Sequence, residues 1–122
     1  MQFNDNLPIY LQIVNQIKKE IATEKLMAGE KLDSVRDLAK KLKVNPNTIA
    51  RVYSEMEQES LVYTERGMGT FLTKDKDILK KLKNEMAKNI VDTYILQMSD
   101  LGFSQKETLE ILSKKLKGDY NE

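Results

Sequence analysis

The chain has 122 residues, of which 40% are hydrophobic and 32% charged, a composition that favours a folded domain over a disordered chain. It contains no cysteine and no histidine, which excludes disulfides, zinc fingers, thiol nucleophiles and Ser-His-Asp triads. With 20 basic and 19 acidic residues the formal net charge is only +1, so total charge gives no sign of a nucleic-acid partner.

The sequence also bears on the cellular location of the protein and on whether it is an enzyme. No stretch approaches about 18 apolar residues, and the first residues lack the basic and apolar regions of a signal peptide. We therefore expect a cytoplasmic protein with no membrane contact. No glycine-rich phosphate loop or metal-ligand spacing accompanies the carboxylates, so we expect no enzyme activity, no cofactor and no metal.

Three helices are predicted in the first half of the chain, because apolar residues recur there at spacings of three and four. The first begins near Pro8 and continues to about residue 25, with an apolar face of Tyr10, Ile13, Val14, Ile17 and Ile21. The second is opened by Ser34 as N-cap, with a buried stripe of Val35, Leu38, Ala39 and Leu42. The third is opened by Asn45 and Pro46 and turns Ile49, Val52, Tyr53 and Met56 inward.

A β-hairpin is predicted next. Residues 61–64 and 70–73 are rich in β-branched and aromatic side chains, and the five residues between them include Gly67 and Gly69. From residue 74 the pattern becomes helical again, with an apolar stripe over about 25 residues that ends before Gly102. A capping box formed by Ser104 and Glu107 predicts a last helix.

Three helices followed by a hairpin is the order of a winged helix-turn-helix. A short turn between the second and third helices would project the start of the third helix, where Asn47 and Arg51 can contact bases or phosphates. Ser34 and Arg36, at the positive end of the second helix, suit a phosphate. Arg66 at the hairpin tip suits a minor groove.

Local charge agrees with this interpretation. Between Lys31 and Arg51 there are six basic residues and two acidic ones, a local charge of +4 that the acidic residues at 55, 57 and 59 largely offset in the total. A basic patch on a neutral domain is compatible with double-stranded DNA as the partner.

At these residues the chain resembles the GntR family of bacterial transcription regulators. The matching runs are Pro8-Ile9-Tyr10, residues 29–32, 34–39, 44–48 and 51–53, and the wing motif from Arg66 to Phe71. The Asn-Pro-Asn-Thr turn and the short tail resemble the YtrA-like branch, whose members lack a large effector-binding domain. The resemblance implies a DNA-binding domain at residues 7–73 and repression of transcription. It also implies contributions to DNA binding from Gly67 and Gly69 of the wing.

Three positions depart from the family pattern. The family usually has glycine where this chain has Lys43, so we expect Lys43 to adopt a left-handed conformation. Other branches have arginine at the positions of Pro46 and Ala50, which have no side-chain donor here. Base reading is therefore expected of Asn45, Asn47, Thr48 and Arg51.

The tail, residues 74–120, has three possible tasks: closing over a small molecule, binding another protein, or dimerising. Its two amphipathic helices cannot bury both stripes on each other, which favours a homodimer on a palindromic operator. The stripe drifts too much for a heptad repeat, so we expect a helix bundle rather than a long coiled coil. The alternative for the whole chain is a winged-helix adaptor that binds protein and not DNA. Whether a small-molecule effector exists is left open.

Overall fold

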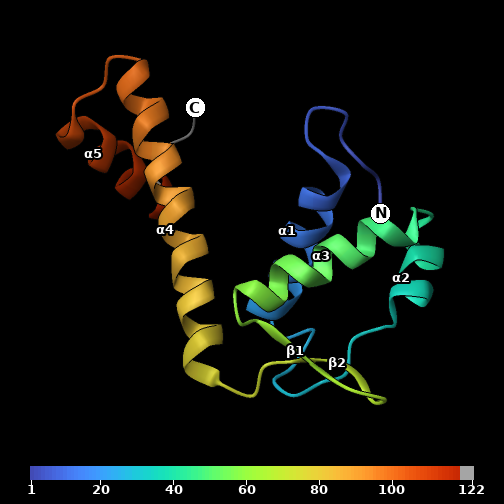
Figure 1. Cartoon of the computed structure of the whole chain (residues 1–122). Helices are drawn as coiled ribbons and strands as arrows, with labels where there is room; N and C mark the ends of the chain where they lie inside the picture. The colour runs from blue at the N-terminus through green and yellow to red at the C-terminus, as the bar shows by residue number, and fades with distance from the viewer. Residues whose placement is uncertain (119–122) are drawn as a thin grey trace. The chain divides into compact units, whose positions relative to one another are not determined.

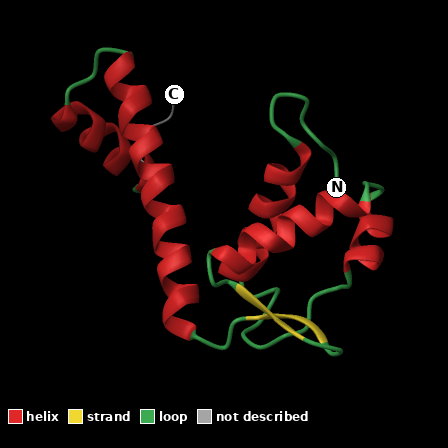
Figure 2. Cartoon of the chain, viewed as in Figure 1, coloured by secondary structure: helices red, strands yellow, loops and turns green. Residues whose placement is uncertain are grey.

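The computed structural model describes residues 1–118 and confirms the predicted mainly helical fold with a small hairpin (Figures 1 and 2). The helices are α1 (Ile9–Ala22), α2 (Val35–Leu42), α3 (Pro46–Gln58), α4 (Lys76–Asp100) and α5 (Gln105–Leu116). The strands are β1 (Val62–Glu65) and β2 (Gly69–Leu72). Two compact units are present, one from Met1 to Lys83 and one from Asn84 onward. Residues 119 and 120 of the predicted tail lie outside the described residues.

The core of the first unit is centred on α3, which packs against α1, α2 and β1. Three of its side chains, Ile49, Val52 and Met56, are completely shielded from solvent. They meet the buried face of α1, formed by Ile13, Val14, Ile17 and Ile21 as predicted. Cutting a fully buried side chain such as Met56 back to alanine costs about 2–5 kcal/mol, because the cavity is only partly refilled. The position of α3 is therefore fixed by its buried side.

The predicted buried stripe of α2 is only partly right. Ala39 is buried, whereas Val35, Leu38 and Leu42 are half-buried. This helix has only eight residues and packs mainly on α3, so few of its side chains are fully covered. Most of the surface of α2 is consequently open to solvent or to a partner.

Left-handed residues other than glycine end the helices of the first unit. The predicted end of α1 near residue 25 was wrong, because Glu24 has φ +60° and the helix stops at Ala22. The amide of Leu26 then donates to the carbonyl of Glu20 at 3.1 Å, which satisfies one free helix-end acceptor. Lys43, with φ +57°, does have the predicted left-handed conformation.

The hairpin pairs more residues than the sequence indicated. Glu65 lies opposite Gly69, so the strands are joined by residues 66–68 rather than by the predicted five residues. The amide of Met68 closes this turn on the carbonyl of Glu65 at 2.9 Å, which makes the tighter connection possible. An unpredicted third segment, residues 30–32, bonds to the free edge of β2 through Leu32 and Leu72. This pairing ties the α1–α2 connection to the hairpin.

The second unit holds the rest of α4 and α5. Ser104 and Glu107 form the predicted capping box at the start of α5, and the hydroxyl of Tyr94 donates to the carbonyl of Thr108 at 3.1 Å. Large apolar side chains of this unit remain exposed: Ile90, Val91, Ile95, Leu96, Leu101, Phe103, Leu109, Leu112 and Leu116. None of the helices in residues 1–118 has the length and apolar character needed to cross a membrane.

Candidate nucleic-acid interface

The connection from α2 to α3 consists of three residues, Lys43 to Asn45. The left-handed backbone of Lys43 reverses the chain at this point, and its amide bonds back to the last turn of α2. On the other side, the hydroxyl of Tyr53 donates to the carbonyl of Asp33 at 2.6 Å. Burial raises the pKa of this phenol well above its usual value, so it remains a protonated donor at any ordinary pH. The Tyr53 contact ties the segment before α2 to α3, and the left-handed Lys43 sets the turn between the two helices.

The first turn of α3 carries three of the predicted base-reading residues. The side-chain oxygen of Asn45 accepts from the amide of Asn47 at 2.8 Å, so Asn45 is an N-cap and only its NH₂ group is free for a ligand. The side chain of Asn47 is exposed, and Thr48 is half-buried. Of the three, Asn47 has the most freedom to reach another molecule.

Arg51 lies one turn further along the same exposed face of α3. Its guanidinium carbon is 3.6 Å from the centre of the Tyr10 ring, which comes from the first turn of α1. Its Nε lies 3.7 Å from Oε1 of Glu55. Tyr10 was predicted to belong to the apolar face of α1, and its contact with Arg51 was not predicted. No sequence signal at short range indicates it, because it depends on how α1 packs on α3.

The start of α2 offers donors to an anion. The hydroxyl oxygen of Ser34 accepts from the amide of Asp37 at 3.1 Å, which leaves its proton free. The amides of Val35 and Arg36 have no acceptor among the described residues, as expected in a first helical turn. Arg36 is exposed and forms no ion pair in that part of the chain. The carboxylate of Asp37 in the same turn opposes an anion, so the Arg36 charge is needed there.

A shallow groove of about 510 Å³ joins the two helix starts. It is lined by Arg36, Ala39, Lys40, Lys43, Val44 and Pro46. The neighbouring Lys41 is instead paired with Asp33 at 2.8 Å, and that hydrogen bond raises the pKa of Lys41. Lys40 and Lys43 were counted in the basic stretch but were not predicted as site residues. The groove brings them beside Arg36, which gives three cationic side chains on one surface.

The hairpin places the remaining predicted residues on a separate element. Arg66 and Gly67 are exposed at the tip, and both glycines of the turn have positive φ, +79° at Gly67 and +123° at Gly69. The side chain of Lys31 lies against the hairpin, with its Cε 2.7 Å from where a Cβ of residue 69 would stand. Lys31 is a further basic residue beside the hairpin, and it was not predicted to contact DNA.

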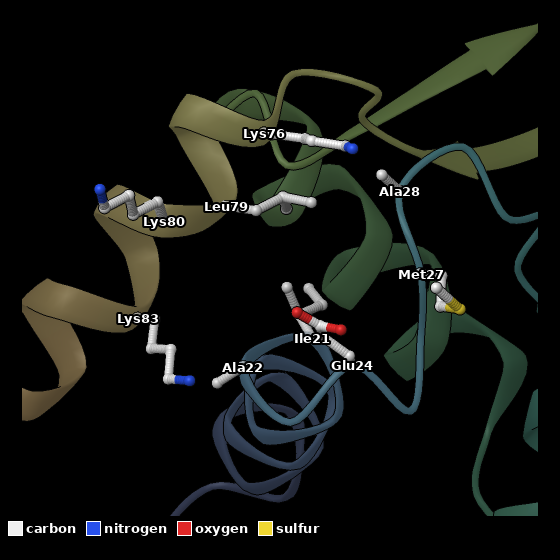
Figure 3. Close-up of a pocket in the computed structure, with 9 residues that line it drawn as sticks. All are labelled: Ile21, Ala22, Glu24, Met27, Ala28, Lys76, Leu79, Lys80 and Lys83. Carbon is white, nitrogen blue, oxygen red and sulfur yellow. The ribbon is translucent and has the colours of Figure 1, made fainter.

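Another concavity, of about 400 Å³, occurs in the first unit (Figure 3). Its lining combines apolar side chains with Lys76, Lys80 and Lys83 from the start of α4. In Figure 3, Lys76 points toward Ala28 and Lys83 toward Ala22. It shares no lining residue with the predicted DNA-contacting set.

Comparison with known proteins matches residues 9–72 to the family described as bacterial regulatory proteins, gntR family. The chain is similar to the HTH-type transcriptional regulator YhcF of Bacillus subtilis, at 44% identity over 109 residues, 89% of this chain and 90% of YhcF. It is also similar to the HTH-type transcriptional repressor YtrA of Bacillus subtilis, at 34% identity over 115 residues, 91% of this chain and 88% of YtrA.

Solved structures show the same similarity. A GntR family transcriptional regulator from Listeria monocytogenes matches with a TM-score of 0.86 and 46% identity, over 92% of this chain and 98% of that one. The DNA-binding domain of AraR, solved in complex with an operator, matches with a TM-score of 0.53 and 26% identity, over 60% of this chain and 86% of that one.

Proposed function

We propose that this chain, which belongs to the GntR family of bacterial transcription regulators, represses transcription by binding a palindromic operator as a homodimer. The predicted resemblance to the family and to its YtrA-like branch is confirmed, and the chain is a DNA-binding transcription regulator rather than an enzyme. The observation that carries the proposal is the exposed face of α3, with Asn47 and Arg51 beside the cationic groove.

In this proposal each element has its own contact with DNA. The start of α3 enters the major groove, where Asn47 and Arg51 face base edges and the Asn45 amide and Thr48 hydroxyl assist. Ser34 and Arg36 hold a backbone phosphate at the start of α2. The wing, with Arg66, Gly67 and Gly69, follows the backbone into the adjacent minor groove. The AraR domain bound to its operator supports this use of the fold.

Repression is supported by the similarity to YtrA, which is named a transcriptional repressor. A dimer bound over a promoter excludes RNA polymerase, so occupancy alone is sufficient for repression. Since the target is chromosomal DNA, we place the protein in the cytoplasm. We keep residues 7–73 as the DNA-binding domain and 74–120 as the dimerisation tail.

Dimerisation is supported by the exposed apolar side chains of the second unit. Ile90, on α4, is 71% exposed, and Leu109 and Leu116, on α5, are similarly open. Exposed apolar surface of this extent marks an interaction site, and a second copy offers the same surface in return. A bound small molecule and a different protein partner are the alternative occupants.

The test is selection of binding sites from a pool of random duplexes with the full-length chain. The proposal predicts enrichment of an inverted repeat whose half-sites are separated by about 34–36 Å or a multiple of that spacing. Footprinting on the selected duplex should then protect both halves. Failure to enrich any sequence would favour the alternative, a winged-helix adaptor that binds protein without DNA.

A further inference from the structure

The contact between Arg51 and Tyr10 leaves the arginine able to bind a further partner. The guanidinium carbon lies over the Tyr10 ring, 3.6 Å from its centre, and a cation–π contact of this kind engages the charge of the group and needs none of its N–H donors. Glu55 lies on the Nε side, at 3.7 Å. The terminal Nη groups have no partner among the described residues, so their donors remain free.

Tyr10 differs from the core residues of α1 in its burial and in its contacts. It is half-buried, whereas the core positions of α1 that follow it are fully buried. Its hydroxyl has no hydrogen bond in the described part of the chain, while those of Tyr53 and Tyr94 each donate to a backbone carbonyl. The main contact of its ring with a charged group is the one with Arg51.

A free arginine side chain on a helix surface samples many rotamers, and fixing it for bidentate recognition costs conformational entropy. The Tyr10 ring at the guanidinium carbon and the Glu55 carboxylate near Nε restrict Arg51 before any ligand arrives. Since both come from outside the first turn of α3, they do not block the face that carries Asn47.

We propose that Tyr10 is a positioning residue for DNA recognition: its ring holds the Arg51 guanidinium, with Glu55 at Nε, so that the Nη donors face the bases. This inference rests on the proposed function and deepens it. It assigns a task in sequence discrimination to α1, an element to which the predicted set of DNA-contacting residues assigned none.

The experiment measures affinity for an operator selected in vitro and for a scrambled duplex of equal length and salt. Arg51→Ala should lower the operator-to-scrambled ratio about 5- to 150-fold if its contact is with a base. Tyr10→Leu should lower the ratio about 2- to 5-fold. Tyr10→Phe, which keeps the ring, should restore most of that loss. Ile9→Ala, in the same helical turn and 44% exposed, is the matched control and should not change the ratio.

A double substitution separates positioning from a general structural effect. In the Arg51→Ala background Tyr10→Leu should cause no further loss of discrimination, because the group it holds is gone. The proton resonances of the Arg51 side chain in the free protein should lie upfield in the wild type and lose that shift in Tyr10→Leu. Thermal unfolding should change little.

Three results would overturn the inference. Equal losses for Tyr10→Phe and Tyr10→Leu would mean that the hydroxyl, not the ring, contacts DNA. Additive losses in the double variant would show that Tyr10 acts without Arg51. An unshifted Arg51 resonance would show that the stack does not form in solution. Failure of the wild type to prefer any duplex is distinguishable from these, since it contradicts the proposed function as well.

Discussion

Arg36 and Arg51 both expose a guanidinium group, but their surroundings give them different tasks. Arg51 is restrained by an aromatic ring and a carboxylate, which suits selective contact with a base edge. Arg36 stands beside free amides at the start of α2 and beside Lys40 and Lys43 in the groove. Such a surrounding attracts any phosphate, whatever the sequence of the DNA.

Replacement of Arg36 by alanine should therefore weaken binding to operator and to random DNA by the same factor. The slope of log affinity against log salt should become less steep by about 0.9, because one fewer phosphate is neutralised. Lys41→Ala is the matched control, since Lys41 is paired with Asp33 and should release fewer counterions. Titrations at four or more salt concentrations measure the slope, and an unchanged slope in Arg36→Ala would argue against a phosphate contact.

The sequence was informative about individual residues where a local rule applies. Ser34, Asn45 and Ser104 cap helices as predicted, because a side-chain oxygen and an amide two or three residues later interact locally. The contact of Tyr10 with Arg51 was not predictable, because it joins residues from two helices whose crossing is set by the whole core. The DNA contacts of the predicted site residues remain predictions. The structure gives the element on which each residue lies and its exposure.

The wing is the element in which backbone conformation is most demanding. Gly67 has φ +79° with open space around it, whereas Gly69 has φ +123° and the Lys31 side chain within contact distance. Gly69→Ala should destabilise the protein by about 1–3 kcal/mol, and Gly67→Ala by about 1 kcal/mol. Chemical unfolding measures both. Equal values would mean that the local strain at Gly69 is relieved by movement of the hairpin.

The capping box of α5 gives a pH dependence. Hydrogen bonds with Ser104 hold the pKa of Glu107 below its ordinary value of 4.5. A carboxyl whose pKa is lowered on folding stabilises the folded form above its unfolded pKa, and that stabilisation is lost as pH falls through the folded value. Protection of α5 amides from hydrogen exchange should therefore decrease below about pH 4.5. Glu107→Gln should remove this dependence, and an unchanged pH profile in the variant would contradict the assignment.

At the level of elements the order of helices and strands was predictable and several ends were not. Hydrophobic periodicity located α1, α3 and the hairpin, since each buries one regular face. The end of α1 was misplaced because Glu24, not a glycine, takes the left-handed conformation. The pairing of residues 30–32 with β2 was not predictable, because three residues are too few to show the alternation of apolar and polar side chains that indicates a strand.

Dimerisation of the whole molecule depends on what covers the exposed apolar side chains of the second unit. Because Ile90 is 71% exposed, its replacement by aspartate should leave the fold of the single chain intact. In a dimer the same change buries a charge against apolar surface, so sedimentation should show monomers. Asn89→Asp adds the same charge at an adjacent exposed position and is the control, which should remain dimeric. A dimeric Ile90→Asp variant would place the interface elsewhere.

Linking two DNA-binding units gives the second half-site an effective concentration on the order of millimolar, which raises affinity by about 10²–10⁴ without a new contact. A modest affinity of each α3 for its half-site is therefore sufficient for the dimer to select an operator. The Ile90→Asp variant should lose this factor on a palindrome and keep the wild-type affinity for one half-site.

The most direct test of sequence-specific binding is a titration of the full-length chain on three duplexes across a salt series. The duplexes carry the selected operator, one half-site, and a scrambled sequence of equal length. We expect the operator to bind at least about 10³-fold more tightly than the scrambled duplex at physiological salt. We also expect log affinity to fall with log salt concentration on all three duplexes, with a slope of about −0.9 per phosphate contact. Equal affinity for operator and scrambled DNA, or no binding to either, would contradict sequence-specific binding.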